Sequence, residues 1–372
     1  MSRTAERLAC GLLEQAGIEV GGSRPWDIQV HDNRLWGRVM GGGSLALGES
    51  YMDGWWDTES IDRFIARLFE ARIEERVRGD RRAMLVAMRF RFGNPQVLRR
   101  AFQIGERHYD TGNDLFSAML DRRMVYSCGY WRDAADIHEA QEAKLDLICR
   151  KLELQPGMTL LDIGCGWGSL LQYAAERYGV TGTGVTVSRR QAELARERCR
   201  GLPVTIELQD YRALSGSYDR VASVGMAEHV GWRNYPVFMQ TAHRVLKPGG
   251  LFLLHTIGSN RSRHGVDPWV ERYIFPNSML PSLAQLSSAA EPWFVAEDVH
   301  NFGPYYDRTL LAWDERFRDA WPRLAERYGE RFCRMWRYYL LSSAASFRVR
   351  RIQLWQLLLS RPPRPGLVSR IE

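Results

Sequence analysis

The residues whose types and spacing most clearly suggest chemistry lie in the segment DIGCGWG, which contains Asp162, Gly164, Gly166 and Gly168. The acidic residue closes an apolar stretch, 159–163, that has the length of a buried strand, and a helical pattern follows over 170–178. Glycine permits a tight turn and a close approach of the backbone to a ligand. The amino end of a helix attracts negatively charged groups. The spacing therefore predicts a ligand-binding loop between a strand and a helix.

The elements that must position this loop begin at about residue 135, where short apolar segments alternate with amphipathic ones. The expected strands cover 159–163, 180–187, 204–208, 220–224 and 251–255, and the expected helices cover 137–152, 170–178, 189–199 and 235–245. Short apolar strands that alternate with helices indicate a parallel sheet covered on both faces. Such sheets bind ligands beyond the carboxyl ends of their strands. We therefore predict an α/β fold with a binding site at that edge of the sheet.

The D-x-G-x-G-x-G spacing is similar to the first motif of the Rossmann-like methyltransferases, and differs from the G-x-G-x-x-G of dinucleotide dehydrogenases. A turn of sequence KPGG at 247–250, before the fifth strand, adds to this similarity. We therefore expect S-adenosylmethionine as the cofactor. The second strand of such folds usually ends in an acidic residue that binds the ribose, whereas here it ends in VTVS. The polar groups available there are Thr186 and Gln191, and Asp210, after the third strand, is placed to reach the adenine.

The composition is typical of a soluble globular protein, because 45% of the 372 residues are apolar and 26% are charged. No stretch approaches the roughly 20 apolar residues that span a bilayer. The N-terminus lacks the continuous apolar core of a secretory signal, so we expect a cytoplasmic protein. The six cysteines are scattered without a C-x-x-C pair, and the eight histidines show no H-E-x-x-H spacing. These patterns argue against a disulfide framework and against a metal site.

The net charge of +7 is concentrated in a basic segment, 76–100, where eight arginines are interspersed with apolar residues. Anionic lipid surfaces and nucleic acid both attract such a segment. One interpretation is a contact with a lipid surface. The other is a solvated linker helix with one face packed on the next domain. No recognised RNA- or DNA-binding module is present, so we expect no nucleic-acid partner.

Four further polar groups are expected to meet on the carboxyl side of the sheet: Cys128, Glu228, His255 and Tyr306. Glu228 follows the fourth strand and His255 ends the fifth. Each residue has an ordinary explanation when it is taken alone, since a lone histidine is usually structural and a lone cysteine is usually a small buried hydrophobe. Their convergence on one crevice is harder to explain in that way and predicts a functional site.

Six motifs resemble those of the cyclopropane-fatty-acyl-phospholipid synthases: LGESYMDGWW at 47–56, YSCGYW at 126–131, LDIGCGWG at 161–168, EHVG at 228–231, LHTIG at 254–258 and YYDRTL at 305–310. The resemblance covers nearly the whole chain. The related mycolic acid cyclopropane synthases are shorter and lack the N-terminal part, so the first motif points to the phospholipid-acting branch. The resemblance implies a class I methyltransferase sheet with a small N-terminal domain and an insert that covers an acyl channel.

The resemblance also implies a reaction that suits these residues. In this family, the cis double bond of an unsaturated phospholipid acyl chain attacks the methyl group of S-adenosylmethionine and leaves a carbocation. Bound bicarbonate accepts a proton from the added methyl group, and the ring closes. The resemblance assigns bicarbonate binding to Cys128, Glu228, His255, the backbone of Ile257, and Tyr306. An anion there would stabilise the carbocation in a dry site, and Cys128 would line the pocket without acting as a nucleophile.

Further cofactor contacts are implied by the resemblance for Tyr109, Tyr126 and Ser127. The implied partners are an unsaturated phospholipid of the inner leaflet, the inner membrane as a peripheral contact, and a second copy of the chain in a homodimer. The expected domains are a small N-terminal lipid-associated domain at 1–85, a basic linker helix at 86–105, and a catalytic domain at 106–372 with the insert at 258–304. In the first of these domains, we expect a strand at 26–30, a glycine turn at 41–43 and an amphipathic helix at 61–77.

Three alternatives remain open at this point. The same carbocation could lose a different proton and give a methyl- or methylene-branched acyl chain. A nucleic-acid methyltransferase would also be basic. A lipid-binding scaffold could keep the cofactor fold without turnover, although the matched cofactor and bicarbonate positions favour an enzyme.

Overall fold

The computed structural model describes residues 2–79, 112–366 and 371. They form two compact units, which we describe separately. The first unit comprises residues 1–119, 265–277 and 310–351, and the second comprises residues 120–264, 278–309 and 352–372. The predicted linker helix at 86–105 lies outside the described residues, so the predicted division at that helix stays a prediction.

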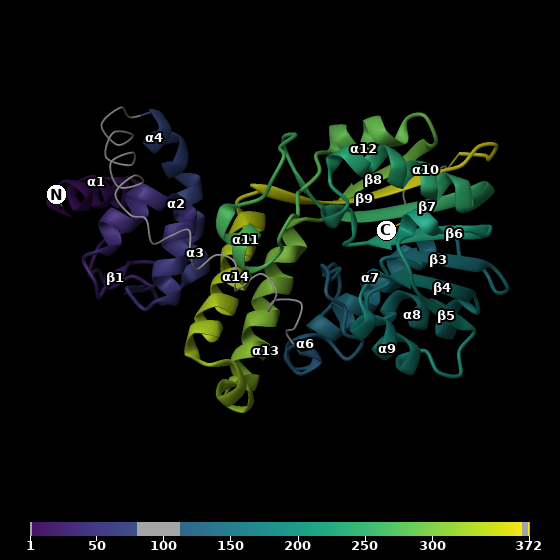
Figure 1. The fold of residues 1–372 in the computed structure, drawn as a ribbon, viewed down its shortest axis with the longest axis horizontal. Coiled ribbons are helices and arrows are strands. Elements are labelled where there is room, and N and C mark those ends of the chain that lie inside the picture. Colours follow the sequence, from purple (N-terminus) through teal and green to yellow (C-terminus); the bar gives the residue numbers. More distant parts are fainter. Residues whose placement is uncertain (1, 80–111, 367–370, 372) are drawn as a thin grey trace. The chain divides into compact units, whose positions relative to one another are not determined.

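A seven-stranded sheet forms the centre of the second unit (Figure 1). Its order is β5-β4-β3-β6-β7-β9-β8, and the strands are β3 (Thr159–Ile163), β4 (Thr181–Thr186), β5 (Val204–Leu208), β6 (Tyr218–Val224), β7 (Leu246–Ser259), β8 (Val295–Asn301) and β9 (Ile352–Ser360). The first five strands in this order run parallel, whereas β9 is antiparallel to both β7 and β8. The predicted α/β fold is confirmed. Sequence analysis predicted the five parallel strands and missed the two antiparallel ones.

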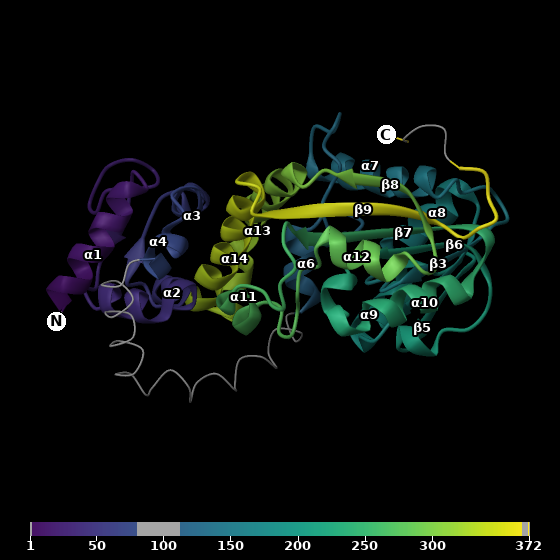
Figure 2. The same cartoon turned by 90° about the horizontal axis from the view of Figure 1, so that it is seen from above.

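Helices cover both faces of this sheet (Figure 2). They are α7 (Ile137–Lys151), α8 (Ser169–Tyr178) and α9 (Arg189–Arg198) on one face, and α10 (Tyr235–Val245) and α12 (Leu283–Ala290) on the other. Successive residues of β7 alternate between the two cores. Leu251 and Leu253 pack with α7 and α8, whereas Phe252 and Leu254 pack with α10 and α12. This alternation follows from the pleat of a strand.

The first unit is mainly helical. It contains α1 (Ser2–Gln15), β1 (Gln29–Val30), α2 (Leu35–Met52), β2 (Trp56–Asp57), α3 (Ile61–Glu70), α4 (Ile73–Gly79), α6 (Asn113–Met119), α11 (Pro268–Tyr273), residues 310–328 of α13 (Pro304–Tyr328) and α14 (Glu330–Arg348). Within the predicted insert at 258–304, α11 belongs to this unit, whereas α12 and β8 belong to the other.

Three local predictions for the first unit were wrong in part. The predicted strand at 26–30 is limited to β1. The predicted turn at 41–43 lies inside α2, where Gly43 (φ 57°) produces a kink instead of a turn. The predicted helix at 61–77 breaks into α3 and α4, because Arg72 adopts a left-handed backbone conformation (φ 51°) that a continuous helix cannot contain.

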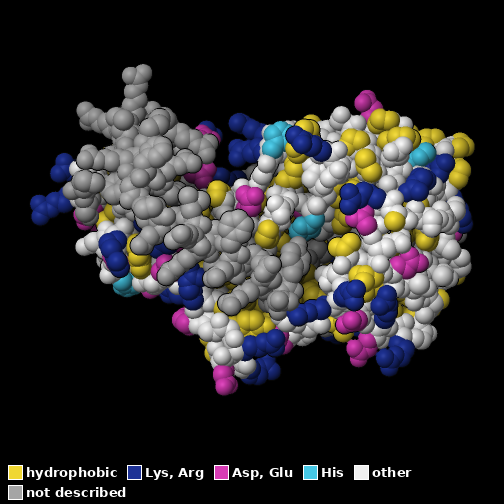
Figure 3. All heavy atoms as spheres, viewed as in Figure 1, with side chains coloured by type: hydrophobic (Ala, Val, Ile, Leu, Met, Phe, Trp, Pro, Cys, Tyr) yellow, Lys and Arg dark blue, Asp and Glu magenta, His cyan; other side chains and the backbone are white. Residues whose placement is uncertain are grey.

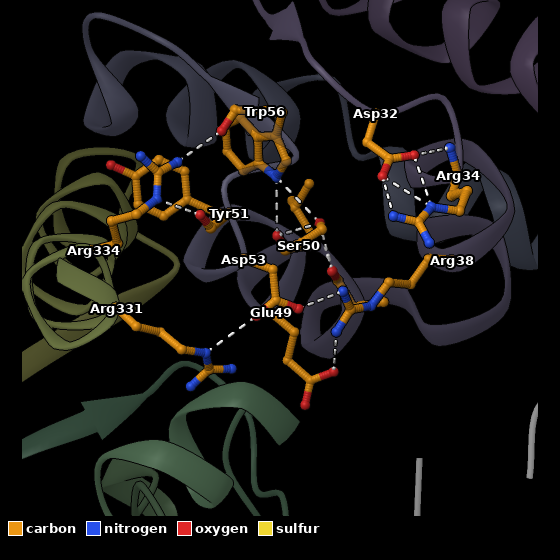
Figure 4. A network of polar contacts seen from close by, with 12 residues as sticks. Asp32, Arg34, Arg38, Glu49, Ser50, Tyr51, Asp53, Trp56, Arg331 and Arg334 are labelled. Carbon is orange, nitrogen blue, oxygen red and sulfur yellow. Dashed lines mark hydrogen bonds and ion pairs between the residues drawn. The ribbon is translucent and has the colours of Figure 1, made fainter. Parts of the chain in front are cut away.

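The motif LGESYMDGWW at 47–56 builds a polar network in the first unit (Figure 4). Glu49 is buried, accepts a hydrogen bond from Tyr273 Oη (2.9 Å), and pairs with Arg38 (3.0 Å) and Arg272 (2.9 Å). Beside it, a side-chain carbon built onto Gly48 would lie 2.4 Å from the indole of Trp269. The motif therefore joins α2 to α11 within this unit, and its glycine is required by the close approach of the indole.

Candidate active site

The glycine loop connects β3 to α8 and has the conformation that its sequence predicts. Gly164, Gly166 and Gly168 have φ angles of 86°, 54° and 78°, which lie in the left-handed region that glycine tolerates best. The N–H groups of Gly164 and Cys165 both donate to the carbonyl oxygen of Val185 (3.0 Å), and these bonds anchor the loop to the end of β4.

The space around the loop fits a ligand that approaches the backbone closely. A side-chain carbon built onto Gly164 would lie 2.8 Å from Met226, whereas one built onto Gly166 would meet nothing within 4 Å. The loop is therefore packed at its first glycine and open at its second. The backbone that leads into the N-terminus of α8 is thus accessible to a bound molecule.

Asp162 supplies an unpaired acceptor beside this loop. Its side chain is buried, and Oδ1 has no hydrogen-bond partner among the described residues. Burial raises the pKa of this carboxyl to about 7, and the nearby Lys144 ammonium group opposes the rise. A buried carboxylate oxygen without a protein partner is suited to a ligand that carries an ammonium or a hydroxyl group.

Lys144, on α7, is a second buried charge in this region. Its Nζ donates to Ser127 Oγ (2.9 Å), and burial lowers its pKa to about 8. The carbonyl oxygen of Ser127 accepts a hydrogen bond from Gln141 Nε2 (2.7 Å). Two side chains of α7 therefore fix the segment that contains Ser127 and the half-buried Tyr126. Tyr109, the remaining predicted cofactor contact, lies outside the described residues.

Thr186 and Gln191, the polar groups predicted at the end of the second strand, lie together. Thr186 Oγ1 donates to Gln191 Oε1 (2.9 Å) and accepts from the N–H of Ser188 (3.2 Å), which is the N-cap of α9. Asp210 is paired with Arg212 through two contacts of 2.8 Å, and the Arg212 guanidinium group holds the Asp210 pKa below its usual value. A contact between Asp210 and adenine stays a prediction.

Glu228 and Ile257 are in direct contact. Glu228 lies in a 3-10 turn (Ala227–His229) just after β6, and its Oε1 accepts the Ile257 N–H at 2.7 Å. Burial raises the pKa of the Glu228 carboxyl, and the hydrogen bond from Ile257 opposes this rise. The other oxygen, Oε2, is buried without a partner among the described residues. The Ile257 N–H, which was predicted to bind an anion, thus donates its hydrogen bond to Glu228. A contact between this N–H group and a bound anion stays a prediction.

His255 lies two residues before Ile257 on β7, so both side chains point to the same face of the sheet. The imidazole is almost fully buried, its Nδ1 is 3.5 Å from Gln356 Nε2, and its Nε2 has no partner among the described residues. Burial, together with the positive charges of Lys144 and Lys151, lowers the pKa of His255 well below its usual value. The imidazole is therefore neutral at physiological pH.

Cys128 and Tyr306 are connected through Thr309. Thr309 Oγ1 accepts from the Gly129 N–H (3.1 Å) and from Trp131 Nε1 (2.8 Å), and it donates to the carbonyl oxygen of Tyr305 (2.9 Å). It also lies 3.9 Å from Cys128 Sγ. Thr309 follows Tyr306 by three residues on α13, so the two side chains lie on one face of that helix.

The environment of Cys128 fits the predicted role in the pocket. The thiol is fully buried, and burial raises its pKa. It therefore stays protonated at neutral pH and is a poor nucleophile.

Sequence reasoning missed three residues of this site, namely Lys144, Thr309 and Gln356. Lysine is rare in this arginine-rich chain, with three in 372 residues, and that rarity could have drawn attention to Lys144. Thr309 is part of the YYDRTL motif, but a threonine in a helix gives no signal of its own. Gln356 is part of an apolar strand and is recognisable only from its register with His255.

The order of the sheet and the glycine loop after β3 define a Rossmann-like, S-adenosylmethionine-dependent methyltransferase. A family model described as mycolic acid cyclopropane synthetase matches residues 96–357, and the chain belongs to this family.

Two relatives and one solved structure illustrate the similarity. The chain is 52% identical over 361 residues to the cyclopropane-fatty-acyl-phospholipid synthase of Escherichia coli. The aligned residues cover 97% of this chain and 94% of that relative. It is 33% identical over 390 residues to the tuberculostearic acid methyltransferase UfaA1 of Mycobacterium tuberculosis, with coverages of 98% and 91%. The crystal structure of the mycolic acid cyclopropane synthase CmaA1 complexed with SAH and CTAB is 32% identical, with a TM-score of 0.64 and coverages of 68% and 96%.

Proposed function

We propose that the chain transfers a methylene group from S-adenosylmethionine to the cis double bond of an unsaturated phospholipid acyl chain and forms a cyclopropane ring. The relative from Escherichia coli that carries this name is 52% identical over nearly the whole length of both chains. The CmaA1 structure covers 68% of this chain, whereas the Escherichia coli relative also matches the N-terminal region. This difference supports the phospholipid as the substrate.

The observation that carries the proposal is a pair of buried polar atoms, Glu228 Oε2 and His255 Nε2, that have no partner among the described residues. Leaving such atoms unpaired costs about 1–3 kcal/mol each, so a site that keeps them is built for a polar ligand. Bicarbonate offers both donor and acceptor positions, and the two side chains complement it. When bound, bicarbonate would supply the base that removes a proton from the added methyl group.

The residues of the chain have distinct parts in this proposal. Glu228 is held by Ile257 and presents its second oxygen to the ligand. His255, which is neutral, presents Nε2, and the buried Cys128 is proposed to line the pocket and exclude water. Tyr306 lies on the same helix face as Thr309 and is the fourth side chain of the proposed bicarbonate site. The low polarity of these surroundings strengthens the electrostatic stabilisation of a carbocation by a nearby anion.

The cofactor site is proposed at the glycine loop. The glycines would lie against the methionine part, and Asp162 Oδ1, which no described residue contacts by a hydrogen bond, suits the ammonium group of S-adenosylmethionine. The CmaA1 structure, which contains SAH, supports this location. We assign supporting contacts to Tyr126, Ser127, Thr186 and Gln191.

Peripheral contact with the inner membrane is part of the proposal, as is a homodimer in the cytoplasm. None of the described helices is both long and apolar enough to cross a membrane. On the face drawn in Figure 3, basic side chains are dispersed among acidic ones over the described residues. The basic segment 76–100 is the proposed lipid contact, and the insert at 258–304 is proposed to cover the acyl chain.

A second candidate function is methyl transfer that gives a branched acyl chain. The relative from Mycobacterium tuberculosis favours it, because that protein is named a methyltransferase and is 33% identical over 98% of this chain. The two reactions share the attack on the methyl group and differ in the fate of the carbocation. In one, the added methyl group loses a proton and its carbon closes the ring; in the other, proton loss leaves a double bond in a methyl- or methylene-branched chain.

The proposal is tested by turnover of S-adenosylmethionine in the presence of phospholipid vesicles. Vesicles of cis-unsaturated phosphatidylglycerol should support turnover, whereas vesicles of the saturated lipid should not. Removal of dissolved bicarbonate should lower the rate, and its addition should restore it. Equal turnover with both lipids would contradict the alkene as the acceptor, and a rate independent of bicarbonate would contradict the proposed base.

A further inference from the structure

Three polar side chains form a row across the antiparallel part of the sheet. In the strand register, Gln356 of β9 is the partner of His255 on β7 and also the partner of His300 on β8. Directly paired residues project to the same face of a sheet, so the three side chains are neighbours. Gln356 and His255 are almost completely buried, and the row runs from the candidate active site through β9 to the edge strand β8, where His300 is half-buried.

The contact within this row has a direction. Gln356 presents its amide nitrogen to His255, with 3.5 Å between Nε2 of the glutamine and Nδ1 of the histidine. In this orientation of the amide, whose Oε1 is buried without a partner among the described residues, the nitrogen donates and Nδ1 of the imidazole accepts. A neutral imidazole carries one proton, which then resides on Nε2. That nitrogen is the one without a partner among the described residues.

Burial, and after it the positive charges around the row, keep His255 neutral. Lys151 of α7 is almost fully buried, and its Nζ lies 3.0 Å from Asp298 Oδ2 and 3.1 Å from His300 Nδ1. Lys144 lies on the same helix, seven residues earlier in the sequence. Both cations disfavour a second proton on His255. The neutral His255 side chain can adopt either of two tautomers. Gln356 is the side chain that determines which tautomer forms.

We propose that Gln356 is a positioning residue that holds His255 in the Nε2–H tautomer, so that His255 donates a hydrogen bond into the active site. His255 therefore acts as a donor to a bound acceptor and does not act as the base. The identity of that acceptor as bicarbonate rests on the proposed function, whereas the tautomer does not. In many enzymes the orientation of a histidine is set by the bond that its other nitrogen makes.

The experiment reads the tautomer directly in the full-length protein without lipid. Histidine nitrogens are isotope-labelled, and long-range nitrogen–proton NMR distinguishes protonated from unprotonated ring nitrogens. The signals of His255 are assigned by their loss in His255→Gln. In the unsubstituted chain, Nε2 of His255 should be protonated and Nδ1 should not. Protonation at Nδ1, which an inverted Gln356 amide would produce, would overturn the proposal.

Two variants test the role of Gln356, with a matched control on the same strand. Gln356→Glu replaces the donor with an acceptor and should move the proton to Nδ1. Gln356→Met removes the donor and should leave a mixture of tautomers. Both should lower turnover on the order of 10- to 100-fold without changing the affinity for S-adenosylmethionine. The control is Gln353→Met, since Gln353 of β9 is also buried but bonds Asn301 (3.0 Å).

The outcomes separate this inference from the proposed function. An unchanged tautomer in both folded Gln356 variants would overturn the inference, and so would a changed tautomer with normal turnover. If the Gln356→Glu variant fails to fold, the tautomer and the turnover of Gln356→Met decide whether the inference holds. Absence of turnover in the unsubstituted chain would contradict the proposed function, while the NMR measurement would still decide the tautomer.

Discussion

Glu228 and His255 show how single residues define the chemistry of this site. Each has one polar atom that bonds another protein group and one buried atom that finds no partner in the described part of the chain. Folding alone gives no reason to keep such atoms, because apolar side chains of similar shape would avoid the cost. The free atoms therefore indicate a ligand that offers both donors and acceptors.

Substitution of Glu228 by Gln should lower turnover far more than cofactor affinity. The amide keeps the shape of the side chain but removes its negative charge, so we expect a decrease in kcat of about 100-fold or more. Binding of S-adenosylmethionine, measured by calorimetry, should change by about twofold at most, because the glycine loop is not altered. The control is Glu207→Gln on the exposed side of β5. A loss of cofactor binding as large as the loss of turnover would refute the assigned role.

The affinity for S-adenosylmethionine should increase with pH through about 7. Burial disfavours the charged form of Asp162 and raises its pKa to about 7, so the carboxyl becomes ionised only as the pH passes that value. The ionised form attracts the cationic cofactor more strongly. Calorimetric titrations from pH 6 to pH 8, roughly one unit on each side of this pKa, should show the increase.

Lys144→Met should move this pH dependence upward. The Lys144 cation lowers the Asp162 pKa, so its removal raises that pKa further. The matched control is Lys247→Met, which removes a cation that pairs with Asp219 (2.8 Å). An unchanged midpoint in Lys144→Met, or an equal change in both variants, would contradict the coupling.

The site residues differ in how far they could be predicted from the sequence. The glycines were predictable because their spacing carries a conformational requirement. Lys144 was not, since a lysine in an amphipathic helix is normally solvated, and only the fold shows that this one is buried. The role of Gln356 depends on its pairing with His255, which lies about a hundred residues earlier in the chain. Local sequence patterns do not encode such a pairing.

At the scale of elements, the parallel strands were predictable and the antiparallel ones were not. Short apolar strands between helices have a distinctive pattern, and β3 and β5 were predicted with the bounds that the structure has. The segment of β8, VAEDVHN, mixes charged and apolar residues. The segment of β9, IQLWQLLLS, is an apolar run that is compatible with a helix or a strand. Only pairing with β7 determines its structure.

The connection between the Cys128 segment and α13 depends on one hydroxyl group. Thr309→Val removes the atom that accepts from Gly129 and Trp131, and leaves these two buried donors unpaired. We expect a loss of about 1–3 kcal/mol in the free energy of unfolding. Turnover should also fall, because the Cys128 segment and Tyr306 lose their common anchor.

Thermal unfolding and turnover measure the two effects. Thr309→Ser, which keeps the hydroxyl group, should restore most of both. Thr205→Val, at an exposed position of β5, is the control for the loss of a threonine hydroxyl. A Thr309→Val chain with normal stability and turnover would show that the connection has no role.

At the scale of the whole molecule, the two compact units are built from interleaved segments of the chain. A division into consecutive domains is the simplest interpretation of a sequence, because local patterns indicate where elements are but not which of them pack together. The insertion of α11 and α14 into the first unit arises from contacts such as Gly48 with Trp269, which are distant in sequence. Composition alone does not indicate them.

The basic segment 76–100 should contribute to lipid binding, although most of it lies outside the described residues. Reversal of Arg89 and Arg91 to Glu should weaken binding to anionic vesicles in a sedimentation assay, because each basic residue near the surface contributes about 1 kcal/mol. The control reverses two exposed arginines elsewhere, Arg200 and Arg244. Equal effects of both double variants would assign the segment to a linker.

The most direct test of the central claim is the structure of the product. S-adenosylmethionine with an isotope-labelled methyl carbon is incubated with the protein and vesicles of cis-unsaturated phospholipid, and the extracted lipid is examined by NMR. We expect the label to appear as a ring methylene with the upfield proton signals of a cyclopropane, and the alkene signals to decrease in proportion. Label found only in a methyl or exocyclic methylene group, with no upfield signals, would contradict ring formation.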